Sequence, residues 1–417
     1  MSATNMGEVG HPINGLDAIL KRLDDADGAH DTDGGTELGE WDAGTDKAPI
    51  YPRAWLLGNV FCRRFLSSLI AAGGTGKTAL RIAQYLALAS GKPITGEHVF
   101  RRCRVLVISL EDDAEELRRR VRAAMLHHGV SPAEVAGYLY LAAPVGSGWR
   151  LATSDASGKI IPGSLEPRIA DAVRRLDLDL VALDPFVKSH AVEENANGAI
   201  DHVATILTRL AVTHNIAVDV PHHVSKGAAD AGNADRGRGA SAFKDAARLV
   251  YTLTAMTEEE AKGMNITEAD RRFLVRVDSA KVNIAPPAKH ATWFRLIGVP
   301  LLNGTDEYPN GDEVQTVEPW TAPDTWAGLS SVILNQILTD IDAGMENGQR
   351  YSSASAAGDR AAWRVVEKHC STKSEAQCRE IIKTWLQNGV LVAGDYEDPI
   401  QRHKRSGLRA NSAKRPS

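Results

Sequence analysis

The sequence predicts an α/β protein with a central, mostly parallel sheet, followed by a small C-terminal domain of three helices and a hairpin. Short, nearly continuous apolar runs alternate with helical stretches, as in a doubly wound sheet with strands buried on both faces. The first such run breaks into a glycine-rich turn and then a helix. After about residue 325 the periodicity becomes almost entirely helical.

The glycine-rich turn organises the chain. Residues 66–78 read LSSLIAAGGTGKT, and a helix is expected over 79–90. Backbone N–H groups can wrap a phosphate only where side chains do not intervene, so the glycines predict a P-loop. Ala71 stands where the pattern G-x-x-x-x-G-K-[ST] has its first glycine. We expect Lys77 to reach the β- and γ-phosphates of ATP and Thr78 to hold Mg²⁺. The predicted nucleotide-binding residues are Ala72, Gly73, Gly74, Thr75, Gly76, Lys77, Thr78 and Ala79.

The composition limits the number of domains and the class of protein. A chain of 417 residues with 43% hydrophobic residues is long enough for about two domains. It has no long uncharged apolar run and no basic-then-apolar start, which predicts a soluble, cytoplasmic protein without a membrane contact. Its four cysteines lack C-x-x-C spacing, which argues against zinc and disulfides. The net charge of −5 does not itself predict nucleic acid, but basic residues gather in 401–417.

The chain is expected to contain five segments. They are a mostly disordered acidic segment (1–48), a RecA-like ATPase domain (49–300), a Gly/Pro/Asp-rich linker (301–325), a winged-helix-like domain (326–405) and a basic tail (406–417). The predicted ATPase strands after the P-loop are 104–110, 138–142, 178–184, 216–220, 248–254, 273–282 and 292–297, and the predicted helices are 114–128, 165–176 and 199–214. C-terminal helices are predicted over 329–343, 360–369 and 374–388, the last with a Ser374–Gln377 capping box.

ATP hydrolysis needs an acid near Mg²⁺ and a carboxylate that orients the attacking water. Asp184 ends an apolar strand and suits the metal role. In many P-loop ATPases the next residue is the catalytic Glu, but here it is Pro185. Glu111, at the end of the strand after the P-loop helix, is therefore the candidate base, with Asp112 and Asp113 as its local rivals. RecA-like ATPases use this arrangement.

From about Trp55 to Trp320 the chain resembles the RepA-type branch of hexameric, DnaB-like replicative helicases. The matching segments are Ala71–Thr78, Glu111–Asp112, Leu183–Asp184, His222–Gly227, Arg238–Ser241 with Arg248, and Lys281–Asn283. The resemblance implies that Glu111 activates water, that Asp184 supports Mg²⁺, and that His222 and His223 sense the γ-phosphate. It also implies that Arg248 reaches a neighbouring subunit's nucleotide as an arginine finger, and that Lys281 belongs to the nucleotide-binding set.

The expected function is therefore an ATP- and Mg²⁺-dependent DNA helicase of plasmid or phage replication. It would form a homo-oligomeric, hexameric ring on single-stranded DNA, with the C-terminal domain as a loading or partner module. Two stretches are predicted to face DNA, 186–197 with Lys188 and His190, and 226–238 with Arg236 and Arg238. The face of the last helix with Arg379, Lys383 and Gln387, and the segment 402–409, would suit a duplex or a protein partner.

Two alternatives stay open. A RecA-like recombination or repair ATPase would share the catalytic residues but form filaments without unwinding DNA. A non-translocating ATPase switch would bind duplex DNA tightly and displace no strand.

Overall fold

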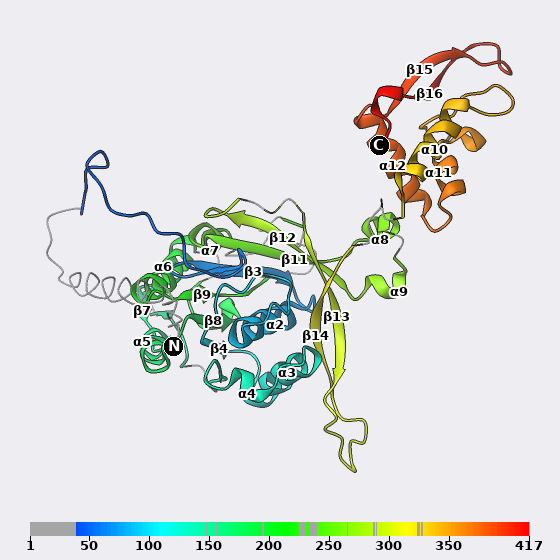
Figure 1. Cartoon of the computed structure of the whole chain (residues 1–417). Helices are drawn as coiled ribbons and strands as arrows, with labels where there is room; N and C mark the ends of the chain where they lie inside the picture. Colours follow the sequence, from blue (N-terminus) through cyan, green and yellow to red (C-terminus); the bar gives the residue numbers. More distant parts are fainter. Residues whose placement is uncertain are drawn as a thin grey trace, which may run out of the picture. The chain divides into compact units, whose positions relative to one another are not determined.

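The computed structural model describes residues 39–416 except 147, 156, 194–195, 225–230, 233–239, 265, 287, 289, 323–325, 327 and 355 (Figure 1). The chain divides into two compact units between Ala54 and Trp55, six residues beyond the predicted start of the ATPase domain. In the described part of the first unit, residues 39–54, no residue lies in a helix or strand. Most of the segment predicted to be disordered lies outside the described residues.

The second unit is built on a ten-stranded sheet with the order β14-β13-β12-β11-β3-β9-β8-β4-β5, in which β10 also pairs with β3. All pairs from β11 to β5 are parallel, and those from β11 to β14 are antiparallel. The predicted α/β class is thus confirmed. The strands are β3 (Leu66–Ala72), β4 (Val105–Ser109), β5 (Leu139–Ala142), β8 (Leu180–Asp184), β9 (Ala217–Asp219), β10 (His222–Val224), β11 (Leu249–Ala255), β12 (Leu274–Val282), β13 (Thr292–Pro300) and β14 (Glu313–Trp320).

Helices cover both faces of the parallel strands, which explains why those strands are apolar throughout. On β4, Val105 and Val107 pack against α2 (Lys77–Ser90) and α3 (Ala114–His127). The alternate residues Leu106 and Ile108 belong to the core under α5 (Leu165–Leu176), α6 (Asn197–Thr213) and α7 (Ala240–Ala246). The smaller elements are β1 (Trp55–Leu57), β2 (Phe61–Cys62), β6 (Ala152–Ser154), β7 (Ile160–Pro162), α4 (Pro132–Val135), η1 (Phe186–Ser189), α8 (Glu258–Met264) and α9 (Glu268–Arg271).

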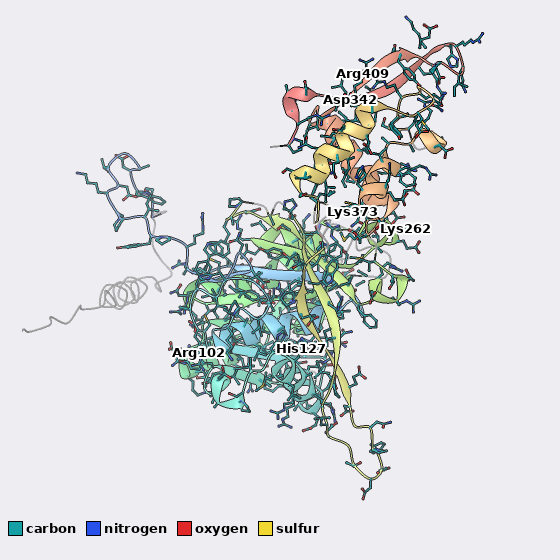
Figure 2. The ribbon with its side chains drawn as sticks, turned by 45° about the vertical axis from the view of Figure 1, so that its right-hand side comes forward. Arg102, His127, Lys262, Asp342, Lys373 and Arg409 are labelled. Carbon is teal, nitrogen blue, oxygen red and sulfur yellow. The ribbon has the colours of Figure 1, made fainter. Side chains whose placement is uncertain are left out.

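The predicted linker 301–325 is wrong over residues 313–320, which form β14. This strand pairs antiparallel with β13 from Pro300↔Glu313 to Trp293↔Trp320. Its middle residues Thr316 and Val317 are buried, but the Gly-, Pro- and Asp-rich flanks concealed that short pattern. Two side-chain contacts join the strand and its hairpin to α3. His127 Nε2 lies 3.3 Å from Glu318 Oε2, and Arg119 forms an ion pair with Asp312 at 3.2 Å; Figure 2 shows His127 beside these strands.

The C-terminal residues form their own apolar core from three helices and a hairpin. The elements are α10 (Ser331–Ala343), α11 (Trp363–His369), α12 (Glu375–Gln387), β15 (Leu391–Glu397) and β16 (Lys404–Ala410), with short 3₁₀ turns η2 (Gly358–Arg360) and η3 (Ser412–Lys414). The Ser374–Gln377 capping box is confirmed. The predicted tail 406–417 is wrong at its start, because those residues continue β16 and Ala410 N donates to Asp342 Oδ1 (3.1 Å), near Arg409 in Figure 2.

The sequence predicts neither a membrane-spanning segment nor disulfide bonds. Within the described residues, no helix combines the length and the apolar character that crossing a membrane requires. None of the four cysteines forms a disulfide, and three of them, Cys62, Cys103 and Cys378, are buried. Cys370 is half-buried.

Candidate active site

The P-loop begins directly after β3, which explains why position 71 does not require a glycine. Ala71 is an extended residue of β3, fully buried and paired with His223 on one side and Leu253 on the other. The turn itself begins after Ala72, and there Gly74 and Gly76 have φ of +80° and +93°. A side chain at Gly76 would also meet Leu296 Cδ2 at 2.5 Å. Glycine is therefore required in the turn and not at the end of the strand.

The helix that follows presents its N-terminus to the loop. Gly76 is the N-cap of α2 and supplies no side-chain cap, and the first turn carries no acidic residue. The first N–H groups of a helix lack partners within the helix, and its dipole places partial positive charge there. This end of α2 is therefore suited to hold an anion such as a phosphate.

Asp184 joins the P-loop residues expected to bind phosphate and Mg²⁺. Its Oδ1 lies 2.6 Å from Lys77 Nζ, and Thr78 Oγ1 donates to its Oδ2 at 3.1 Å. Lys77 is only 3% exposed, so its ammonium is fixed where the loop turns. The Thr78 hydroxyl and the Asp184 carboxylate thus place oxygen atoms next to each other. Mg²⁺ in proteins is bound by such oxygens together with substrate phosphates. The residues therefore fit Mg²⁺ bound with a nucleotide.

The three consecutive acids after β4 have three different surroundings. Glu111 is 58% exposed, and its Oε2 lies 3.7 Å from His223 Nε2. Asp112 is held by Arg120, with Nε 2.8 Å from Oδ2. Asp113 caps α3 by accepting the N–H of Glu116 at 2.8 Å. Asp112 and Asp113 are thus engaged by Arg120 and by the first turn of α3, whereas Glu111 is exposed at the cavity beside His223.

His223 and His222 alternate across β10 and meet different environments. His223 is half-buried beside Glu111, and burial lowers its pKa while Glu111 and Asp184 oppose that shift. His222 is 4% exposed and points into the core on the other face. The structure therefore brings His223 to the site, whereas His222 lies behind it.

These residues enclose one cavity of about 230 Å³. Of the eight predicted P-loop residues, six line it and Gly73 and Thr75 do not. Glu111, Asp184 and His223 also line it. Sequence reasoning missed three further lining residues, Ser109, Arg120 and Gln315. No local signal marks Arg120 within a helix rich in arginine, and Gln315 lay in the supposed linker. The full lining is Ala72, Gly74, Gly76, Lys77, Thr78, Ala79, Ser109, Glu111, Asp112, Arg120, Asp184, His223 and Gln315.

Arg248 and Lys281 lie away from this cavity. Arg248 precedes β11, whose Leu249 pairs with Ser67 near the start of β3, whereas the P-loop follows the end of β3. Its side chain is exposed and has no hydrogen bond or ion pair within the described parts of the chain. Lys281 Nζ donates to the carbonyls of Lys244 and Asp245 at the end of α7 (2.9 and 2.7 Å). Both nucleotide roles thus stay predictions that require a second copy of the chain.

The two stretches predicted to face DNA, 186–197 and 226–238, are described by the structure to different extents. His190 is only 5% exposed and packs on Phe186 with ring centroids 4.8 Å apart, so its predicted place on a DNA-facing surface is wrong. It is held inside because Phe186 and Phe243 form an aromatic cluster there. Lys188 in the same stretch is exposed. Most of 226–238, with Arg236 and Arg238, lies outside the described residues.

His190 and His222 predict an acid-sensitive core. Both pack on Phe186, and burial lowers the pKa of each from 6.5 to about 4. Between these values the unfolded chain binds protons that the folded chain does not, so stability falls as pH drops through this window. We expect about 2 kcal/mol of unfolding free energy to be lost per histidine between neutral pH and about pH 5.

Urea unfolding at the two pH values measures this loss. Replacing His222 by Gln should reduce the pH dependence, whereas replacing the exposed His202 on α6 by Gln should leave it unchanged. An equal pH dependence in all three proteins would contradict the assignment.

Comparison with known families supports this geometry. Residues 35–229 match the family model of an AAA domain. The matched range contains the P-loop, Glu111, Asp184 and His223, and it ends before Arg248, Lys281 and Gln315. The match and the cavity together support a P-loop ATPase function for this part of the chain.

Proposed function

We propose that this chain is an ATP- and Mg²⁺-dependent, ring-forming DNA motor, a replicative helicase of the plasmid or phage type that moves on single-stranded DNA. The observation that carries the proposal is the convergence of Glu111 and His223, from β4 and β10, on the P-loop that holds Lys77. Glu111 lies just after β4, and His223 lies on β10. Because the two side chains are adjacent, a change at the γ-phosphate can be transmitted through His223 to the residues that follow β10.

The hydrolytic roles follow from charge and position. Lys77 neutralises charge on the phosphates, and the N–H groups at the start of α2 add to that stabilisation. Glu111 orients a water and accepts its proton, which is what a carboxylate with an open side can do. Mg²⁺ held by Thr78 and Asp184 would offset the negative charge on the β- and γ-phosphates. Because His223 lies beside Glu111, loss of the γ-phosphate changes its hydrogen bonding.

ATP hydrolysis would be coupled to DNA through the basic segment that directly follows His223. His223 stands two positions before residue 225, where the segment with Lys226, Arg236 and Arg238 begins. A shift of β10 on hydrolysis would move that basic segment along the phosphates of a single strand. The exposed Lys188, which follows the strand of Asp184, provides a second cation on a loop that starts at the same site.

Arg248 would act on a nucleotide only when copies of the chain assemble into a ring. An exposed arginine at the end of the sheet opposite the P-loop has no phosphate to bind in its own chain. In a closed ring of identical subunits, one surface of each copy faces a different surface of the next, so Arg248 can reach a neighbour's nucleotide.

The C-terminal module offers a surface for a loading partner. A hollow of about 450 Å³ lies over α12 and is lined by Trp363, Arg379, Lys383 and Gln387 among others. Guanidinium groups of Arg364 and Arg379 lie 4.8 and 5.4 Å from the Trp363 ring centroid. Arg379 and Lys383 pair with Glu375 (2.5 Å) and Glu380 (3.2 Å) of the same helix, so the surface combines an aromatic ring with ion-paired side chains and suits a protein partner.

Strand displacement on a forked duplex tests the motor. We expect displacement with ATP, none with a non-hydrolysable analogue, and none by Glu111→Gln protein with ATP. Adding Arg248→Ala subunits to wild-type protein should reduce displacement more steeply than in proportion, because each one disables its neighbour's site.

The matched control for mixing is Arg272→Ala, an exposed arginine that pairs only with Glu268 among the described residues. It should dilute into the assembly without a loss of activity. Tight binding to duplex DNA with ATP hydrolysis but no displacement would replace the motor by the ATPase switch. Filaments on DNA in electron micrographs would favour the recombination ATPase.

A further inference from the structure

The turn that carries Glu111 is fixed on both sides of this residue. The residue before it, Leu110, donates its backbone N–H to the carbonyl of Asp184 at 2.8 Å. The residue after it, Asp112, donates its backbone N–H to the hydroxyl of Ser109 at 3.0 Å. Ser109 ends β4, and Asp184 ends the neighbouring strand β8. The backbone at Glu111 is therefore tied to the end of the sheet, next to the candidate metal-binding acid.

Arg120 ties the same turn to the next helix. It lies within α3, where its Nε is 2.8 Å from Asp112 Oδ2 and its Nη2 donates to Asp112 Oδ1 at 3.4 Å. The guanidinium also pairs with Glu116, one turn earlier in α3, at 3.1 Å. The side chains of Arg120 and Asp112 are only 30% and 21% exposed, so solvent screens this ion pair less than a fully exposed one. Asp112 is thus held both by its backbone and by its carboxylate.

The charge of Arg120 has a consequence for the cavity, which Glu111, Asp112 and Arg120 all line. Two carboxylates already surround the single positive charge of the guanidinium, so a phosphate would have to displace one of them. Without Arg120, the carboxylate of Asp112 would be a second unpaired acid beside Glu111. It would then compete with Glu111 for the attacking water and repel the phosphates.

We infer that Arg120 positions Glu111 for hydrolysis by holding Asp112, an inference that rests on the proposed ATPase function. A general base must stand within hydrogen-bond reach of the water from which it takes a proton. Glu111 is 58% exposed and lies 3.7 Å from His223, so the turn that carries it sets its position. Because a misplacement of about 1 Å can cost roughly 10²-fold in rate, the contact between Arg120 and Asp112 controls kcat. Arg120 is thus a positioning residue that acts through its neighbour.

ATP binding and hydrolysis by Arg120→Met protein test the inference. The substitution removes the cation and keeps an apolar stem. We expect kcat to fall by about 10- to 100-fold, while the dissociation constant of a fluorescent ATP analogue stays within about twofold of the wild-type value. Unchanged binding also shows that the variant is folded. Weaker binding with an unchanged kcat would mean that Arg120 contacts the nucleotide directly, and it would overturn the positioning role.

A double variant tests whether Arg120 acts through Asp112. Asp112→Ala alone should lower kcat about as much as Arg120→Met, because each removes the same contact. Arg120→Met should then lower kcat no further in protein that already carries Asp112→Ala, since residues that act as a unit are not additive. An effect of Arg120→Met that is as large in the Asp112→Ala background as in the wild type would overturn the inference.

The matched control is Arg118→Met, on the same helix but outside the cavity lining. Arg118 is 67% exposed and pairs with Glu115, so its loss should leave kcat unchanged. A wild-type kcat in Arg120→Met, with Glu111→Gln inactive in the same assay, overturns the role of Arg120 and leaves the proposed ATPase intact. Hydrolysis by Lys77→Ala at the wild-type rate would instead overturn the ATPase site itself.

Discussion

Replacing Lys77 by Ala is expected to abolish nucleotide binding and ATP hydrolysis, whereas replacing Glu111 by Gln should abolish hydrolysis and leave binding intact. Lys77 supplies the only buried cation among the described residues of the cavity, so the phosphates lose their main partner in Lys77→Ala. Glu111 is exposed, and its contact is with His223 and not with a P-loop residue, so its loss should leave the phosphate contacts in place. A positioned general base contributes roughly 10²–10⁴-fold to the rate, so its loss should bring hydrolysis close to background.

Two measurements separate these roles. The dissociation constant of a fluorescent ATP analogue should rise strongly for Lys77→Ala and stay unchanged for Glu111→Gln, while kcat falls in the latter. The control is Glu115→Gln, a 64% exposed carboxylate on α3 that pairs with Arg118. Hydrolysis by Glu111→Gln at the wild-type rate would assign the base to another residue, and Asp112 would then be the next to test.

Lys77→Ala has a second consequence that must be measured separately. The variant leaves Asp184, 15% exposed in its side chain, without its ion-pair partner. Breaking a buried pair by removing one partner is destabilising. A melting curve should therefore accompany each binding measurement, and Lys77→Ala protein that remains folded shows that the loss of binding is local.

The predictable part of the site lies where a short stretch carries both structure and chemistry. The run Leu66–Thr78 contains its own strand, turn and helix start. The strand that precedes Glu111 and the strand that ends at Asp184 are apolar because both of their faces are covered. In a parallel sheet the ends of neighbouring strands meet at one edge. Local sequence therefore predicted together the P-loop, the candidate base and the candidate metal-binding acid.

The part that sequence did not predict depends on contacts between distant segments. Gln315 enters the cavity only because β14 returns across α2 and α3, and its strand is flanked by residues typical of a loop. His190 resembled a loop cation, yet Phe186 and Phe243 enclose it. Arg81, in the middle of α2, gives no sign that a partner 138 residues away balances its charge.

That partner is Asp219, at the centre of a buried polar network behind the P-loop helix. Arg81 Nε lies 2.9 Å from Asp219 Oδ2, and the side chains are 2% and 0% exposed. The hydroxyls of Tyr85 and Ser67 also donate to the Asp219 carboxylate, each at 2.6 Å. The network joins α2, four residues after Lys77, to β9, which leads into β10 and His223.

Asp219→Asn and Arg81→Met are each expected to lower the free energy of unfolding by about 3–5 kcal/mol, because each leaves one buried charge or its hydrogen-bonding groups without the partner. The double variant should be less destabilised than the sum of the singles by about 1–3 kcal/mol, since the introduced amide oxygen can still accept from the hydroxyls and no charge stays buried. Urea unfolding of the four proteins gives this coupling energy.

The exposed pair Arg119–Asp312 provides the matched control. Its atoms lie 3.2 Å apart, but the side chains are 39% and 46% exposed, so Arg119→Met with Asp312→Asn should change stability by less than about 1 kcal/mol. Additive losses at Arg81 and Asp219 would show that the two charges do not stabilise each other. A large coupling would instead mean that the P-loop helix and the strand leading to His223 are held as one unit, so that a change at the phosphates reaches His223 through rigid contacts.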